Sequence, residues 1–212
     1  MNRRSPRVRV VAALLTLAGA LAAAPQAHAQ AYPAKPIKMI VPFPAGSATD
    51  TIARVIGASV AASIGQPVLV ENKAGADGAI AGAEVVRAAP DGYTVLMATN
   101  SPMSAAPALR KVPPYDPVAD FSPITDVGRY TFFIVVHPSV PATSVAELVA
   151  HAKANPGALN YATGNTTGIV SMALFASLGG IKMVHVPYKG EPQALTDLVG
   201  GRVQVMVVSA GT

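Results

Sequence analysis

The chain contains no cysteine and has few aromatic or charged residues. Cysteine is absent from all 212 residues, which excludes disulfides and any cysteine-based nucleophile or metal site. Aromatic residues make up 5% of the chain and charged residues 13%. The sequence therefore has neither the basic stripe nor the interleaved aromatics of a nucleic-acid-binding protein. We expect a protein that depends on its hydrophobic core and does not bind nucleic acid.

The one long apolar stretch lies at the N-terminus. Four arginines precede the apolar run Val10–Ala24, and Ala27-His28-Ala29 supplies the small residues of a cleavage site. This pattern predicts that residues 1–29 are a cleaved signal peptide and that the protein is periplasmic. A cut after Ala31 and an uncleaved anchor are the alternatives. Outside this segment the chain has 12 basic and 11 acidic residues. Most of the formal charge of +5 therefore lies in the segment.

Short apolar runs alternate with helical patterns through the remaining residues. We expect strands at 37–41, 67–71, 93–98, 124–127, 132–136, 159–162, 183–186 and 203–208. Helices are expected from Thr49 or Asp50 to 64, and at 79–88, 144–154, 168–178 and 192–199; the third begins with the capping box Ser144–Glu147. This alternation predicts an α/β fold with parallel sheets and right-handed crossovers, whose ligands bind at the carboxyl ends of the strands.

Two of the predicted loops resemble each other. Pro44–Thr49 and Thr163–Thr167 each follow a strand, are small and hydroxyl-rich, and open a helix. The N-terminus of a helix presents free N–H groups and a partial positive charge, so it suits an anion. Neither loop contains arginine, so recognition would rest on backbone amides, hydroxyls and ordered water. We predict that a negatively charged solute lies between the two loops.

Several of these polar residues also have an ordinary structural interpretation. Ser47 and Thr49 could cap the helix or meet the ligand, and Asp50 is interpreted as a helix-start carboxylate rather than a ligand contact. The loop at 163–167 could be a simple polar turn. Tyr188 could reach the ligand or lie in a solvent turn.

The sequence lacks the common catalytic motifs. It contains no G-x-S-x-G, H-E-x-x-H or Walker lysine loop. His137, His151 and His185 are isolated, without an acid or nucleophile at matching spacing. We therefore expect a protein that is not an enzyme and has no cofactor. The alternative is a secreted α/β hydrolase with Ser47 or Ser101 as nucleophile.

Seven segments together resemble one family. They are Tyr32-Pro-Ala-Lys-Pro-Ile37, Val41–Asp50, Gly65–Asn72, Ala89-Pro-Asp-Gly-Tyr-Thr94, Tyr115-Asp-Pro117, Leu159-Asn-Tyr-Ala162 and Val184-His-Val-Pro-Tyr-Lys-Gly190. In this order they resemble the Bug-type solute receptors of tripartite tricarboxylate transporters. The resemblance implies a periplasmic binding protein-like fold of type II, a Venus flytrap with two doubly wound lobes. It also implies a monomer that closes on a small carboxylate and docks on membrane permease subunits; a sensor subunit for a signalling kinase would share this fold.

The resemblance also implies boundaries and site residues. The first lobe would span residues 30–127 and the second residues 128–212. The implied ligand-binding residues are Phe43, Ala45, Gly46, Ser47, Ala48, Thr49, Asn100, Ser101, Thr163, Gly164, Asn165, Thr166, Thr167 and Tyr188. Val207-Val208-Ser209 stands where the family commonly has Phe-Asp-Asn, so an acidic ligand contact is expected to be lost. Family members continue beyond residue 212 and return to the first lobe, so we expect a C-terminally truncated chain with an incomplete first lobe and exposed apolar surface.

Overall fold

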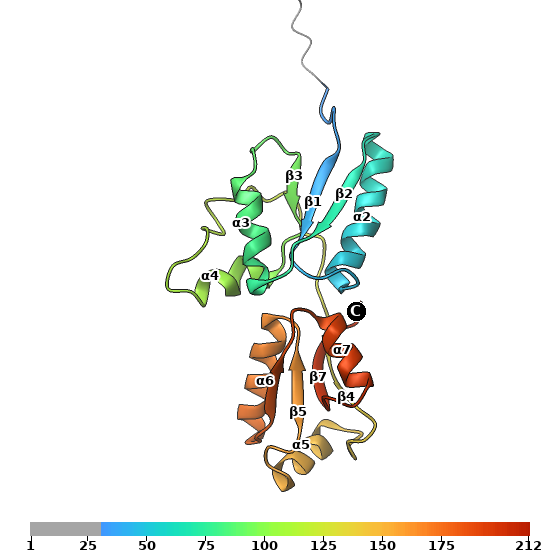
Figure 1. Ribbon diagram of the computed structural model, residues 1–212, viewed down its shortest axis with the longest axis vertical. Helices are drawn as coiled ribbons and strands as arrows, with labels where there is room; N and C mark the ends of the chain where they lie inside the picture. The colour runs from blue at the N-terminus through green and yellow to red at the C-terminus, as the bar shows by residue number, and fades with distance from the viewer. Residues whose placement is uncertain (1–30) are drawn as a thin grey trace, which may run out of the picture. The chain divides into compact units, whose positions relative to one another are not determined.

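The computed structural model describes residues 31–212, and the predicted signal peptide at residues 1–29 lies outside the described residues. Lys35–Thr212 forms one compact unit that contains two separate sheets (Figure 1). None of the helices within residues 31–212 is long and apolar enough to cross a membrane.

The first sheet has three parallel strands in the order β2-β1-β3: β1 (Ile37–Val41), β2 (Val68–Asn72) and β3 (Thr94–Leu96). Helices α2 (Ala48–Ile64) and α3 (Ala79–Arg87) lie on opposite sides of it (Figure 1). The core on the α2 side is small, with Val41, Ala53 and Met97 buried at its centre. A short helical turn, η1 (Ala76–Gly78), leads into α3.

Helix α2 begins earlier than the sequence predicted. The capping residue is Ser47, whose Oγ accepts a hydrogen bond from the backbone N–H of Asp50 at 3.3 Å. Thr49 and Asp50 therefore lie inside the first turn, and the prediction that one of them caps the helix is wrong. Serine caps well because its short hydroxyl reaches the N–H three residues later.

The second sheet has four strands in the order β4-β7-β5-β6: β4 (Phe132–Val136), β5 (Asn160–Thr163), β6 (Val184–Pro187) and β7 (Val205–Ser209). Strands β5, β6 and β7 are parallel, as predicted, but β4 pairs with β7 in the antiparallel direction. The expectation of wholly parallel sheets is wrong here because the chain enters β4 directly from the first sheet. This strand therefore runs away from the first sheet, whereas the other three run toward it.

Helices cover both faces of the second sheet. Alternate residues of β7 point to opposite faces: Val205 and Val207 join the core beneath α5 (Val145–Ala154) and α6 (Thr166–Gly179), whereas Met206 and Val208 join the core beneath α7 (Glu191–Val199). The cap of α5 is confirmed, since Ser144 Oγ accepts from the Glu147 N–H at 3.2 Å. The Glu147 carboxylate accepts from the N–H of Thr143 at 2.7 Å, and backbone hydrogen bonds from Thr143 and, more weakly, from Ser144 lower the pKa of this carboxyl.

Two segments differ from the predicted secondary structure. The polar loop after β3 continues into helical turns, η2 (Ser101–Ala105) and α4 (Ala106–Ala108), which the sequence did not predict because two prolines interrupt them. The strand predicted at 124–127 is absent, and this stretch is irregular. No strand among residues 31–212 pairs with residues 124–127, and Ile124 is 80% exposed. The strand is absent because a short apolar run forms one only where a neighbouring strand can pair with its backbone.

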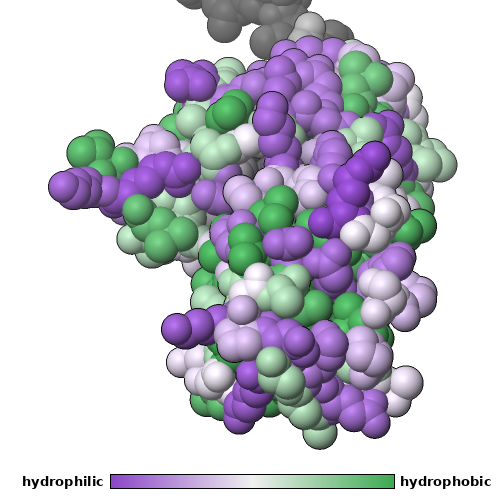
Figure 2. Space-filling view, turned by 60° about the horizontal axis from the view of Figure 1, so that its bottom comes forward, coloured by the Kyte–Doolittle hydropathy of each residue, from purple (hydrophilic) through white to green (hydrophobic). Residues whose placement is uncertain are grey.

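The first sheet is covered less completely than the second. Strand β3 lies at its edge and, among the described residues, has no strand partner on its outer side. A groove of about 830 Å³ runs along β3 and is lined by Ile52 and Ile56 of α2 and by residues 120–130. Figure 2 shows hydrophobic side chains among hydrophilic ones on the surface, and Val112 and Val118 are more than four-fifths exposed.

Candidate functional site

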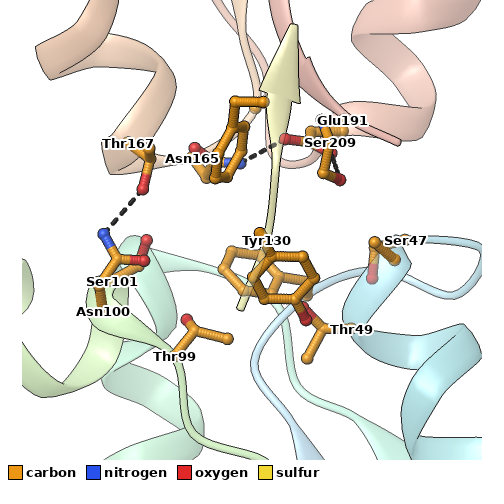
Figure 3. Close-up of a pocket in the computed structure, with 14 residues that line it drawn as sticks. Ser47, Thr49, Thr99, Asn100, Ser101, Tyr130, Asn165, Thr167, Glu191 and Ser209 are labelled. Carbon is orange, nitrogen blue, oxygen red and sulfur yellow. Dashed lines mark hydrogen bonds between the residues drawn. The ribbon is translucent and has the colours of Figure 1, made fainter. Parts of the chain in front are cut away.

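A small pocket lies between the two sheets, where the start of α2 faces the starts of α6 and α7 (Figure 3). Its lining comes from six separate stretches of the chain: Phe43, Ser47, Ala48, Thr49, Thr99, Asn100, Ser101, Tyr130, Phe132, Gly164, Asn165, Thr167, Glu191 and Ser209. The space inside is about 30 Å³, room for roughly two waters at about 15 Å³ of such space each.

A buried carboxylate shapes the first-sheet side of the pocket. Asp50 Oδ2 accepts from the N–H of Gly46 at 3.0 Å and from Arg54 Nε at 3.1 Å. Asp50 Oδ1 accepts from Asn72 Nδ2 at 2.8 Å, and the same amide lies 3.0 Å from the carbonyl oxygen of Phe43. Hydrogen bonds on the side away from the pocket thus hold the loop before α2 in place, and Asp50 itself does not line the pocket. The structure therefore agrees with the interpretation of Asp50 as a helix-start carboxylate.

The same contacts set the protonation of Asp50. Burial by itself raises the pKa of this carboxyl, but the hydrogen bonds from Arg54, Gly46 and Asn72 outweigh burial, and the pKa lies below its ordinary value of 3.8. Asp50 and Arg54 also form an ion pair at 3.0 Å. The Asp50 charge at the start of α2 is therefore compensated by Arg54 on the same helix, while Ser47, Ala48 and Thr49 line the pocket.

Close packing shapes the second-sheet side. Asn165 caps α6 by accepting from the Gly168 N–H at 2.8 Å, and its side-chain amide donates to Glu191 Oε1 at 2.7 Å. Gly164 lies against the backbone of Gly190 and Glu191, so closely that a Cβ at this position would overlap both. The loop that opens α6 therefore touches the start of α7, and only glycine permits this approach.

Several contacts join the two sides, among them that of Gly211, which follows β7, with Ala48 of α2. Asn100 Nδ2 donates to Thr167 Oγ1 at 2.7 Å, and the Tyr130 hydroxyl donates to Thr49 Oγ1 at 2.9 Å. Gly190 packs against the ring of Pro44. The hydroxyl of Thr99, which belongs to the pocket lining, is buried and has no hydrogen-bond partner among the described residues. An unpaired buried hydroxyl is unfavourable, so this group is available to a bound molecule.

The structure brings most of the predicted site residues together. Nine of them line the pocket: Phe43, Ser47, Ala48, Thr49, Asn100, Ser101, Gly164, Asn165 and Thr167. Five do not: Ala45, Gly46, Thr163, Thr166 and Tyr188. Both loops named from the sequence therefore face the same space, but not through every residue.

Four of the residues outside the pocket lining belong to the two loops themselves. Ala45 and Gly46 form the exposed outer bend of the first loop. Thr163 Oγ1 lies 2.7 Å from His185 Nε2, and Thr166 Oγ1 is buried without a hydrogen-bond partner among the described residues.

The fifth residue, Tyr188, is turned toward α7. Its hydroxyl donates to Asp197 Oδ2 at 2.7 Å. Burial, and then the hydrogen bond to the Asp197 carboxylate, raise the pKa of Tyr188. The ligand contact considered for Tyr188 is not supported by this pocket.

Four lining residues were missed: Tyr130, Phe132, Glu191 and Ser209; Thr99, the remaining one, lies in the same polar loop as the predicted Asn100 and Ser101. Ser209 ends a strand, so the rule on carboxyl ends of strands could have found it. No sequence signal identified Tyr130, which lies in the irregular segment before β4. The end of β7 carries Ser209 and no acid, but Glu191 of α7 brings a carboxylate to the same place, and its Oε2 accepts from Ser209 Oγ at 2.6 Å.

The pocket lacks the groups that hydrolysis or metal binding would need. None of its lining residues is a histidine, and no cluster of histidine and acidic residues within the described part of the chain could hold a metal ion. Ser47 Oγ is engaged as a helix cap. Among the lining residues, neither Ser47 nor Ser101 has a neighbouring general base.

Comparison with known proteins identifies the family. The family model described as "Tripartite tricarboxylate transporter family receptor" matches residues 52–212. The chain belongs to this receptor family. Its α/β fold is that of periplasmic binding proteins, as predicted.

Relatives of this receptor family are similar over most of the chain. Protein BugT of Bordetella pertussis is 38% identical over 82% of this chain and 55% of its own length. A UPF0065 protein encoded in the gbd 5' region of Cupriavidus necator is 38% identical over 96% of this chain and 62% of its own length. The chain thus spans about three-fifths of the length of the curated relatives it matches.

Solved structures of receptors agree with this assignment. A structure described as a periplasmic transporter has a TM-score of 0.81 at 42% identity, covering 84% of this chain and 61% of its own. Rpa4515 of R. palustris, solved with adipate, has a TM-score of 0.81 at 33% identity, with 84% and 60% covered. MatC of Rhodopseudomonas palustris, solved with bound malate, has a TM-score of 0.77 at 31% identity, with 84% and 61% covered.

Proposed function

We propose that this protein is an exported, non-catalytic receptor that captures a small organic acid in the periplasm and delivers it to the membrane subunits of a tripartite tricarboxylate transporter. The observation that carries the proposal is the pocket between the starts of α2 and α6, which belong to two different sheets. Membership in a receptor family and the acids bound by Rpa4515 and MatC support it.

The chemistry of the pocket suits a carboxylate. The first N–H groups of any α-helix lack partners within the helix and carry a partial positive charge. Two such helix ends meet here, with the hydroxyls of Ser101, Thr167 and Thr99 beside them. The lining contains no lysine or arginine, so amides, hydroxyls and water would hold the acid. The proposed ligand-binding residues are the nine predicted lining residues together with Thr99 and Tyr130.

Binding would require the two sides to separate and close again. The lobes are proposed at residues 30–127 and 128–212, preceded by a signal peptide at 1–29, in a monomer. A space of about 30 Å³ is far smaller than the roughly 300 Å³ or more of typical ligand pockets. An entering acid would therefore break the Asn100–Thr167 and Tyr130–Thr49 hydrogen bonds, and domain closure would report occupancy to the transporter.

The proposal is tested by calorimetry and thermal shift with a panel of mono-, di- and tricarboxylates and amino acids. At least one acid should bind with one-to-one stoichiometry, and a tenfold excess over its Kd should stabilise the protein by about 1.4 kcal/mol. The acid should be recovered unchanged by NMR after incubation. Failure of every acid to bind, or its conversion to product, would overturn the proposal.

A further inference from the structure

One carboxylate of the protein belongs to the pocket. Glu191 is the first residue of α7, is 5% exposed and lines the pocket, and it is the only charged side chain among the lining residues. In Figure 3 it lies beside Ser209 on the second-sheet side, across the pocket from Ser47 and Thr49. An acid seated on the amides of α2 would therefore face a fixed negative group.

The hydrogen bonds of Glu191 hold it in place. Oε1 accepts from Asn165 Nδ2 at 2.7 Å. Oε2 accepts from Ser209 Oγ at 2.6 Å, from the Ser209 N–H at 3.3 Å and from Thr212 Oγ1 at 2.5 Å. The donors that hold the two carboxylate oxygens come from Asn165, Ser209 and Thr212. Glu191 thus cannot turn away when a second negative group enters the pocket.

The positive charge available in the pocket is limited. Each helix N-terminus is equivalent to roughly half an elementary charge. Glu191 occupies the start of α7 and offsets that helix, which leaves the ends of α2 and α6 to face the ligand. Together they balance about one carboxylate, and no lysine or arginine lines the pocket to balance another.

We infer that Glu191 makes this pocket select acids with a single carboxylate over dicarboxylates of the same shape. The inference rests on the proposed function and deepens it, because it names the ligand class. The far end of such an acid is uncharged or a hydrogen-bond donor, such as a hydroxyl, amide or amine. This preference differs from that suggested by adipate and malate in the relatives' structures.

The test uses adipate and its monoamide, which have nearly the same shape and differ by one charge. Calorimetry on the unmodified protein at neutral pH should show the monoamide binding about tenfold more tightly, because like charges a few ångströms apart repel strongly in a partly buried site. Equal affinity, or tighter binding of adipate, would overturn the inference while leaving the proposed receptor function intact. Failure of both, and of all other acids, would overturn both proposals.

Two variants separate a charge effect from a structural one. Glu191→Gln should reduce the preference to about threefold or less, since the charge is removed. Glu84→Gln, on α3, is the matched control; it removes an equivalent carboxylate that pairs with Lys73 outside the pocket, and should leave the preference unchanged. If Glu191→Gln shifts both affinities equally, Glu191 acts only by positioning Asn165 and the inference is wrong. The comparison on the unmodified protein decides the question if Glu191→Gln does not fold.

Discussion

The two sides of the pocket have similar sequences but are built differently. The loop before α2 is held from behind by the Asp50 carboxylate, which ties Gly46, Arg54 and Asn72 together. The loop before α6 is held by contact, since Gly164 lies against the backbone at the start of α7. The first side depends on a polar network over a small core, whereas the second depends on packing over a sheet covered on both faces. Similar loops can thus owe their shape to different forces, and the two sides should respond differently to mutation.

The largest difference should come from adding one methyl group to each loop. Gly164→Ala would drive Cβ into the Gly190 and Glu191 backbone and should cost about 3 kcal/mol of unfolding free energy and abolish acid binding. Gly46→Ala meets nothing within 4 Å; its only penalty is the left-handed backbone at φ 80°, about 1 kcal/mol. Urea unfolding of both variants measures this. Equal losses of unfolding free energy in the two variants would mean that close packing does not determine the conformation of the loop before α6.

The polar network predicts a pH-dependent effect confined to the first side. Asp50→Asn should destabilise the protein by about 2 kcal/mol at neutral pH, because hydrogen bonds to a charged group are lost. The pKa of Asp50 is lowered in the folded state, so its contribution is fully present above its ordinary value of 3.8 and is lost as pH falls through the folded pKa. The difference between the variant and the unmodified protein should therefore shrink below that pH. Urea titrations across the acid range measure it, and a constant difference would contradict this account.

The two helix caps offer a finer comparison. Asn165 serves both the Gly168 N–H and Glu191, whereas Ser47 serves only the Asp50 N–H, and at a longer distance of 3.3 Å. Replacement by alanine should cost about 1.5 kcal/mol at Asn165 and about 0.5–1 kcal/mol at Ser47. Thermal denaturation of both variants provides the measurement. A larger loss of stability for Ser47→Ala than for Asn165→Ala would contradict the prediction that the cap of α6 contributes more than the cap of α2.

The smallest effect is expected for the hydrogen bond that joins the two sides. Asn100 is exposed and donates to Thr167 Oγ1, so a double-mutant cycle of Asn100→Ala and Thr167→Val should give a coupling energy of about 0.5 kcal/mol. Tyr130→Phe removes the hydrogen bond to Thr49 and tests the second of these side-chain contacts in the same way. A coupling energy indistinguishable from zero would show that this contact does not hold the sides together.

The elements and the two loops were predictable because their signals are local. The apolar run Ile37–Val41, the Ser144 cap and the small residues before α2 and α6 each act within one strand or one helical turn. The same locality explains the errors. The run at 124–127 found no pairing strand, and β4 runs antiparallel because of the direction in which the chain enters the second sheet.

The sequence by itself determined the alternation of strands and helices, the two hydroxyl-rich loops and the absence of catalytic motifs, because these depend on neighbouring residues. Only the tertiary structure decided which side chains share the pocket. Glu191 and Tyr130 lie far along the chain from Thr49, and their arrival there depends on how the two sheets are connected and crossed. Tyr188 directly follows the end of β6, yet its side chain is turned to Asp197. Burial and a hydrogen-bond partner, which no local pattern encodes, set the direction of that side chain.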